Sequence, residues 1–169
     1  AFTYAIADGQ GAEATGTVTV TLAPVNDDPS AEDDVVTTDE DTSVTLDPVD
    51  NDSDIDGDSL VLFGVTQAGN GTVVTNADGT VTYTPDLNYN GPDSFTFHVN
   101  DGELDSNAAV VSITVHAVND APAGLPVITG TVTEDQTLTA DTSGISDIDG
   151  LGAFNYQWLR NGVAISGAT

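Results

Sequence analysis

The sequence of 169 residues has no cysteine, no methionine and only one basic residue, Arg160. Without cysteine, the chain can form neither disulfides nor thiolate metal sites. An exported chain that lacks disulfides needs another means of stabilising its domains, and a bound metal ion is one. Arg160 is the only positive side chain against 28 Asp and Glu residues, so the net charge is −27. Long-range repulsion of phosphate disfavours nucleic acid and anionic membranes as partners.

Long apolar runs are also absent from the sequence. None approaches the length of a membrane span, so we expect no membrane insertion. No signal peptide is visible, because residues 1–6 alternate in the manner of a β-strand. We interpret this beginning as the interior of a domain, and it says little about export.

Short alternating runs of apolar and polar residues make up most of the chain. Apolar residues account for 38% of the sequence, and the carboxylates gather between the runs. This pattern predicts β-strands joined by acidic loops, and it argues against a disordered acidic chain. Residues 76–79, Asn-Ala-Asp-Gly, predict a hairpin, because Asp-Gly supplies the positive φ of a tight turn. Residues 44–46 and 109–116 are two of the expected strands. About seven such strands in about 93 residues are typical of an Ig-like β-sandwich.

A short block of sequence recurs at a fixed interval. Residues 25–29, Val-Asn-Asp-Asp-Pro, return 93 residues later as Val-Asn-Asp-Ala-Pro at residues 118–122. Such a period predicts tandem repeats. We expect the C-terminal strands of one repeat at residues 1–28, a complete repeat at 29–121 and the N-terminal half of an Ig-like repeat at 122–169. Half a domain cannot bury its apolar face alone, so sequence of a longer chain or strands from another chain would complete the outer units.

The densest group of carboxylates lies at residues 50–58, where aspartates alternate with other residues up to Gly57. The spacing matches the first half of an EF-hand loop. Phe63 stands where the closing glutamate of that loop is required, and the flanking segments resemble strands. The pattern therefore favours a calcium-binding loop of another kind, and a solvated acidic turn is the alternative. Recurrence of Ser-Asp-Ile-Asp-Gly at residues 146–150 favours the binding loop.

The order of these motifs resembles that of a cadherin repeat and its interdomain linker. More narrowly, residues 26–118 resemble the bacterial cadherin-like repeat, which occurs in tandem in very large secreted RTX-type and biofilm adhesins. The Tyr-Gln-Trp segment at residues 156–158 resembles another Ig-like repeat of such proteins. The segments that carry the cadherin resemblance are Ala-Asp-Gly at residues 7–9, a strand at 18–22, the linker at 25–29, the glutamate Glu40 and Asp-Ile-Asp-Gly at 54–57.

The resemblance implies an all-β fold of Ig-like or cadherin-like β-sandwich repeats in tandem, outside the cell or at its surface. It further implies Ca2+ at the joints between repeats and no enzymatic activity. The first joint is expected to use Asn26, Asp27, Asp54, Asp56 and Asp101. The second is expected to use Glu40, Asp86, Asn119, Asp120, Asp147 and Asp149. At Asp86 the sequence departs from the family, because Pro-Asp-Leu-Asn at residues 85–88 replaces Leu-Asp-Arg-Glu.

Two other functions stay open at the level of sequence. A carbohydrate-binding module would need an exposed aromatic platform, for which Tyr89 and Trp158 are the candidates; packing in the sandwich is the alternative for both. An accessory region of an extracellular enzyme is the other. No motif in this chain brings a base to a serine hydroxyl, and His98 and His116 are expected to point outward from strands. Expected partners are the neighbouring repeats, with a cell-surface or matrix polysaccharide as a further candidate.

Overall fold

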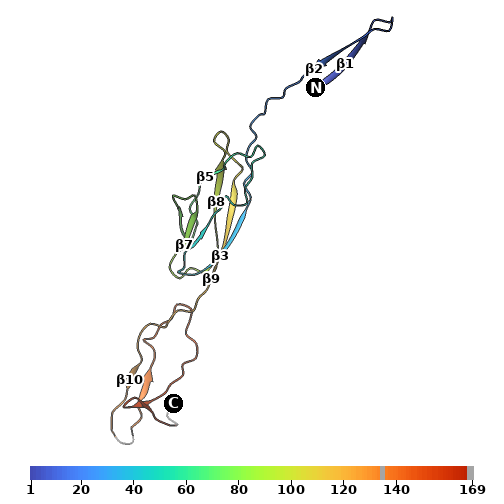
Figure 1. The fold of residues 1–169 in the computed structure, drawn as a ribbon. Coiled ribbons are helices and arrows are strands. Elements are labelled where there is room, and N and C mark those ends of the chain that lie inside the picture. The colour runs from blue at the N-terminus through green and yellow to red at the C-terminus, as the bar shows by residue number, and fades with distance from the viewer. Residues whose placement is uncertain (134–135, 167–169) are drawn as a thin grey trace.

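The structure is a computed structural model that describes residues 1–133 and 136–166. Within these residues every regular element is a β-strand, which confirms the all-β fold class. A hairpin, a β-sandwich and a more open third part follow one another along an elongated molecule (Figure 1). No helix of the described part is long and apolar enough to cross a membrane. The Glu-Asp pair at residues 134–135, which repeats the pair at residues 40–41, lies outside the described residues.

The middle part is a sandwich of two sheets that enclose the core of the molecule. One sheet has the order β3-β9-β8-β5 and the other has the order β4-β7-β6. Their strands are β3 (Asp34–Asp39), β4 (Val44–Leu46), β5 (Val61–Phe63), β6 (Gly71–Thr75), β7 (Val81–Pro85), β8 (Gly91–Asn100) and β9 (Ala109–His116).

Alternation along β8 and β9 places every second side chain in this core. Phe95, Phe97 and Val99 are at most 2% exposed, and the intervening residues are more open. From the opposite sheet, Val81 and Tyr83 are fully buried against them. Burial of each large apolar side chain contributes roughly 1.5–3 kcal/mol, so this cluster supplies most of the driving force for folding of the middle part.

The predicted hairpin in the middle part is confirmed: β6 and β7 pair antiparallel, and Gly79 in the turn has φ +91°. The strands predicted at Val44–Leu46 and Ala109–His116 have the predicted bounds. The strand predicted at residues 18–22 is wrong in its extent, because pairing in the first hairpin ends at Val18. Residues 19–22 have no neighbouring strand to supply the ladder hydrogen bonds.

The two outer parts bury little of their apolar surface. The N-terminal hairpin exposes Phe2 and Ile6 by 69% and 62%, although their equivalents one period later are core residues. In the third part, apolar side chains from several strands are similarly exposed. The strands of these parts are β1 (Phe2–Ala7) paired with β2 (Glu13–Val18), β10 (Val127–Thr129) paired with β11 (Thr139–Asp141), and β12 (Leu159–Arg160) paired with β13 (Val163–Ala164).

Candidate metal centres at the two joints

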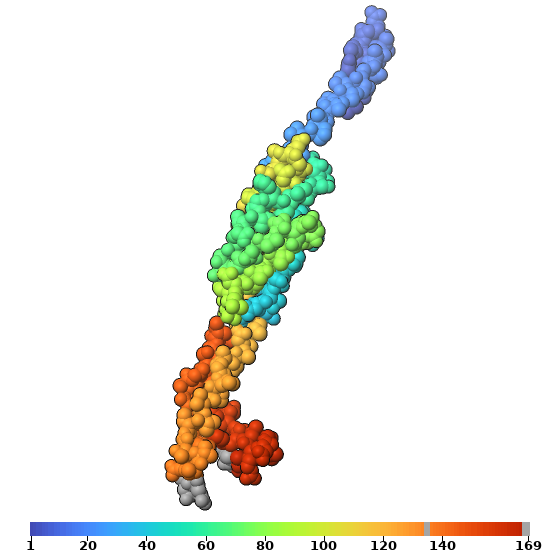
Figure 2. Space-filling model, turned by 90° about the vertical axis from the view of Figure 1, so that its left-hand side faces the viewer, coloured from blue at the N-terminus to red at the C-terminus, as the bar shows by residue number. Residues whose placement is uncertain are grey.

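Strand directions in the sandwich bring the expected ligands to its two ends. β3 runs parallel to β9, so both strands end at the same edge, where the amide of Glu40 donates to the carbonyl of His116 at 2.9 Å. Glu40 therefore lies beside the chain that leaves the sandwich. β8 runs in the opposite direction and brings Asp101 to the other end, near the linker that enters the sandwich. The two linkers are narrow stretches of the molecule (Figure 2).

At the first joint, the linker is tied to the middle sandwich by two hydrogen bonds. The side-chain amide of Asn26 donates to Asp101 Oδ2 at 2.8 Å, and the backbone amide of Asp27 donates to Asp56 Oδ2 at 2.9 Å. Asp54 Oδ1 accepts the amide of Asp56 at 2.8 Å, whereas Asp54 Oδ2 is buried and accepts no hydrogen bond from the described residues. Hydrogen bonds thus connect the five residues expected at this joint in pairs: Asn26 with Asp101, Asp27 with Asp56, and Asp56 with Asp54.

Asp101 is held in its ionised form by local hydrogen bonds. The amides of Leu104 and Glu103 donate to Asp101 Oδ1, and together with the side chain of Asn26 they lower the pKa of this carboxyl group below its usual value. Hydrogen bonds to the charged form favour that form. The carboxylate at the entry of the sandwich therefore stays negative and available to a cation.

The second joint repeats the geometry of the first, one period later. The backbone amide of Asp120 donates to Asp149 Oδ2 at 2.6 Å, and the amide of Asp149 donates to Asp147 Oδ1 at 3.0 Å. An isolated bridge between Ala123 and Ser146 matches the bridge between residues 30 and 53 at the first joint. The two acidic loops are therefore docked on their linkers in the same register.

Glu40 closes the second joint from the side of the middle sandwich. Its side chain is only 4% exposed, and it accepts the amide of Val118 and, at 3.4 Å, the side-chain amide of Asn90. Burial is the largest cause of the raised pKa of Asp120. The charges of Asp149, Asp41, Glu40 and Asp147 raise it further. These carboxylates lie close enough to repel one another, next to a cavity of about 280 Å³ that Asp120 and Asp147 help to line.

Asp41 is a functional candidate that the sequence prediction missed. It has φ +58°, its carboxylate accepts the amide of Asn88 at 2.9 Å, and its charge acts on Asp120. The sequence signal for Asp41 was the Glu-Asp pair at residues 40–41, which recurs at residues 134–135.

The remaining two predicted ligands of the second joint, Asn119 and Asp86, differ from each other in their positions. Asn119 lies in the linker, and its side-chain amide donates to the carbonyl of Asp120 at 2.8 Å. Asp86 is exposed, its amide donates to the carbonyl of Asn70, and its charge acts on Tyr83. None of these described contacts of Asp86 reaches the linker, so its role as a ligand stays a prediction.

The chemistry of both joints fits a hard divalent cation. Asp54 Oδ2 and Asp120 Oδ2 are buried carboxylate oxygens without a donor among the described residues, and Arg160 is the only basic side chain in the sequence. Burial of an ionised oxygen without a partner is costly unless a cation satisfies it. In the described part of the chain, no three His, Asp or Glu side chains already converge as a metal cluster. Calcium would therefore draw on amide and backbone oxygens as well as carboxylates.

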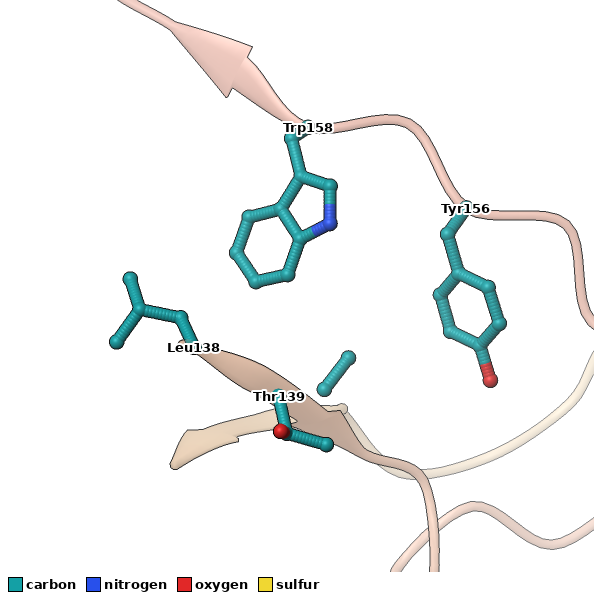
Figure 3. Close-up of a pocket in the computed structure, with 5 residues that line it drawn as sticks. Leu138, Thr139, Tyr156 and Trp158 are labelled. Atoms are coloured by element: carbon teal, nitrogen blue, oxygen red, sulfur yellow. The ribbon is translucent and has the colours of Figure 1, made fainter. Parts of the chain in front are cut away.

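The two aromatic candidates for carbohydrate binding differ in their surroundings. Tyr89 packs against the core and its hydroxyl donates to the carbonyl of Pro92, so it serves as a structural residue. In the third part, Trp158 and Tyr156 line an open cavity of about 250 Å³ together with Leu138 (Figure 3). His98 is half-buried against Phe63, with 6.4 Å between the ring centroids, and His116 is exposed.

Several known proteins are similar to this chain. Protein GAMETE EXPRESSED 2 of Arabidopsis thaliana is 26% identical over 137 residues, which are 81% of this chain and 14% of that protein. Integrin beta-like protein B of Dictyostelium discoideum is 30% identical over an alignment of 90 residues that covers 44% of this chain and 5% of that protein. The chain thus spans a small fraction of the length of these curated relatives.

Similarity to solved structures is weak. An endo-fucoidan hydrolase from glycoside hydrolase family 107 is 24% identical, with a TM-score of 0.42 over 76% of this chain and 21% of that chain. A nucleoside hydrolase-related protein from Saccharophagus degradans that is associated with carbohydrate metabolism is 18% identical, with a TM-score of 0.43 over 54% of this chain and 26% of that chain. Similarity at this level carries no argument about function.

The family comparison agrees with the middle sandwich and the linker that precedes it. The cadherin-like domain family matches residues 25–116, which include the first linker, both sheets and the acidic loop. The chain therefore belongs to the cadherin-like domain family.

Proposed function

We propose that this chain is a calcium-stiffened spacer in a secreted or cell-surface bacterial adhesin. The observation that carries the proposal is the repeated joint: a linker amide docked on an aspartate of the acidic loop, beside a buried carboxylate oxygen that lacks a donor. The hydrogen bond from Asp27 to Asp56 recurs as that from Asp120 to Asp149, and the oxygen without a donor belongs to Asp54 in one joint and Asp120 in the other. We assign the repeat boundaries to residues 1–28, 29–121 and 122–169.

The residues of each joint would act by sharing one cation between parts of the chain. At the second joint, Glu40 comes from the middle sandwich, Asp120 from the linker, and Asp147 and Asp149 from the third part. Calcium is a divalent cation that such oxygens can coordinate. Without it, the carboxylates repel one another and nothing but a few hydrogen bonds restrains the linker. With all three sources bound to one ion, the joint would resist bending.

Calcium concentration would decide where the spacer is stiff. Extracellular calcium-binding modules have dissociation constants of about 10⁻⁴–10⁻³ M. Such joints fill outside the cell and are empty at cytosolic calcium levels, so the chain would be flexible before export. The expected location is therefore extracellular or at the cell surface, with neighbouring repeats as the direct partners.

Thermal unfolding of the whole chain with and without a calcium chelator tests the proposal. We expect about 10 mM calcium to raise Tm, because a ligand at about 10–100 times its Kd stabilises the folded state by about 1.4–2.7 kcal/mol. Asp54→Ala removes a ligand of the first joint and should reduce this shift, whereas Asp78→Ala, in the exposed turn of the middle hairpin, should preserve it. An identical Tm with chelator and with calcium in the unmodified chain would contradict the proposal.

Carbohydrate binding is a second candidate function, supported by one observation. Trp158 and Tyr156 line the open cavity of the third part, and aromatic faces of this kind can stack on sugar rings. A polysaccharide pull-down with Trp158→Ala tests this function, and Tyr89→Ala serves as the control because Tyr89 packs against the core. Retention that Trp158→Ala abolishes would favour the carbohydrate-binding module, and absence of retention would reject it.

A further inference from the structure

Asparagine is followed by glycine at three places in the sequence, where the asparagines are Asn70, Asn90 and Asn161. An asparagine in this position is prone to lose its side-chain amide, because glycine has no Cβ atom to keep its backbone nitrogen away from the asparagine side chain. The reaction requires the peptide unit between the two residues to rotate. The fold around each pair therefore decides whether the pair reacts.

The peptide unit between Asn70 and Gly71 is fixed by the middle sandwich. The backbone amide of Asn70 donates to Asp93 Oδ2 at 2.9 Å, and its carbonyl accepts the amide of Asp86 at 2.9 Å. Gly71 begins β6, and a Cβ atom at this position would lie 2.5 Å from the ring of Tyr83. Rotation at Asn70 would break these hydrogen bonds in a tightly packed place, so the fold protects this pair.

The pair of Asn90 and Gly91 is restrained by the other sheet. The side-chain amide of Asn90 donates to Glu40 Oε2 at 3.4 Å. Gly91 is the first residue of β8 and pairs with Val115 of β9. Because β8 and β9 carry much of the buried core, opening of this pair requires opening of the most stable part of the structure. The fold therefore protects Asn90 as well.

The third pair, Asn161 and Gly162, forms the exposed turn between β12 and β13. Their φ angles are +52° and +78°, as in a two-residue hairpin turn. The carbonyl of Asn161 and the amide of Gly162 make up the peptide unit that must rotate, and neither forms a hydrogen bond with another described residue. A Cβ atom at Gly162 would meet nothing within 4 Å. Nothing in the described part of the chain thus holds this peptide unit in place except the turn itself.

The surroundings of this turn favour its opening. β12 and β13 have only two residues each, and their side chains are exposed. Segments with few buried contacts open at low cost in free energy. A cavity of about 490 Å³ lies beside the turn and is lined by both Arg160 and Asn161, so water reaches the asparagine and a positive charge lies near it. A nearby positive charge favours the anionic form of a group, here the deprotonated amide nitrogen of Gly162.

We propose that Asn161 is a site of spontaneous deamidation, from which the fold protects Asn70 and Asn90. The deprotonated backbone nitrogen of Gly162 attacks Cγ of Asn161, and the bond from Cγ to the side-chain nitrogen breaks. Ammonia leaves with the proton that the Gly162 amide gave up, and a cyclic imide remains. Water then opens the ring at one of its two carbonyl carbons, its hydroxyl joining the carbon and its proton the nitrogen, which gives aspartate or isoaspartate.

The products change the hairpin in two ways. Each places a new carboxylate next to Arg160, the only basic side chain of the sequence. Isoaspartate also adds a carbon atom to the backbone, so the turn no longer has the two-residue geometry that sets the pairing of β12 with β13. Trp158 belongs to the same hairpin, because its carbonyl accepts the amide of Ile165 at 2.9 Å. Deamidation would therefore disturb the hairpin that presents this aromatic side chain, whether or not the joints bind calcium.

The test is incubation of the whole chain at pH 7.4 and 37 °C, followed by chymotryptic digestion and mass spectrometry of the peptides that contain each pair. Aspartate and isoaspartate products are separated by chromatography. We expect Asn161 to convert at least about tenfold faster than Asn70 and Asn90, because the short hairpin opens far more often than the core sheets. The result should be the same in calcium and in chelator, which makes it independent of the proposed function.

The chain unfolded in guanidinium chloride is the matched control. Without the fold, all three pairs should convert at comparable rates, which shows that structure and not local sequence separates them. Asn161→Gln should abolish conversion at this position and leave the other two pairs unchanged. Equal rates at the three pairs in the folded chain would overturn the proposal. It would equally be overturned if Asn161 stayed intact in the folded chain while the unfolded chain was deamidated.

Discussion

Asp93 shows how a carboxylate stabilises this fold without a metal. Its two oxygens accept the amides of Gly69, Asn70 and Ser94 at 2.9–3.0 Å and the hydroxyl of Tyr83 at 2.9 Å. Desolvation by itself would raise the pKa of Asp93, but these hydrogen bonds outweigh it and the pKa is lowered. Asp93 therefore differs from Asp34, whose buried oxygen has no donor.

Replacement of Asp93 by alanine is expected to destabilise the middle sandwich by about 2–4 kcal/mol, because three amides and a buried hydroxyl lose their acceptor. A carboxyl group with a lowered folded pKa stabilises the fold above its unfolded pKa, and this contribution is lost as pH falls through the folded pKa. The difference in stability between the unmodified chain and Asp93→Asn should therefore be largest at neutral pH and shrink below about pH 4. Urea unfolding at several pH values in chelator measures it, and a pH-independent difference would contradict the assignment.

The repeat supplies a matched pair for core packing. Phe95 is 2% exposed, whereas Phe2, one period earlier in the hairpin, is 69% exposed. Phe95→Ala should cost about 3–5 kcal/mol, the usual range for loss of a buried aromatic ring. Phe2→Ala should change stability by no more than about 0.5 kcal/mol, as for most exposed positions. Chemical unfolding of both variants checks this, and similar losses would mean that the hairpin is packed in solution.

At the scale of elements, turns and single strands could be predicted from the sequence, whereas the pairing of strands far apart in the chain could not. The turn at residues 76–79 and the strand Ala109–His116 follow from turn chemistry and alternation, which are read within a few residues. The parallel pairing of β3 with β9 joins segments far apart in the chain, and no local pattern specifies it. That pairing is what brings Glu40 to the second joint.

The same limit applies to the candidate site. The aspartates of the acidic loops were predicted because their spacing repeats, and the structure brings Asp54 and Asp56 to the linker. Asp41 and the buried oxygen of Asp54 were not predicted, since burial of one carboxylate oxygen depends on how the loop folds. Sequence spacing identifies acidic residues on a shared loop, but it does not show which oxygens lack a donor.

Two glycines of the β6–β7 hairpin should respond differently to alanine. Gly79 has φ +91° and open space where a Cβ atom would lie, so Gly79→Ala should cost only the backbone strain, about 1–2 kcal/mol. At Gly71 a Cβ atom would lie 2.5 Å from the Tyr83 ring and 2.6 Å from the carbonyl of Thr84. Gly71→Ala should therefore be the more damaging change. The order of the two Tm values measures this, and a lower Tm for Gly79→Ala would contradict the packing described here.

At the scale of the whole molecule, the charge distribution sets the conditions under which the parts hold together. A net charge of −27 on an elongated chain opposes close approach of successive parts, although salt at physiological ionic strength screens exposed charges that are more than about 8 Å apart. Monovalent salt can weaken the repulsion at the joints, but it cannot join ligands from two parts of the chain. A divalent ion can, so we expect the stiffness of the joints to depend on calcium and not on ionic strength.

The most direct test of the central claim is a distance distribution across the second joint. Because the sequence has no cysteine, Ser112→Cys at an exposed position of β9 and Val163→Cys at an exposed position of β13 give two unique sites for spin labels. Electron–electron resonance in millimolar calcium should give one narrow distribution, and excess chelator should broaden it at the same ionic strength. Equally broad distributions in both conditions would contradict the calcium-stiffened joint.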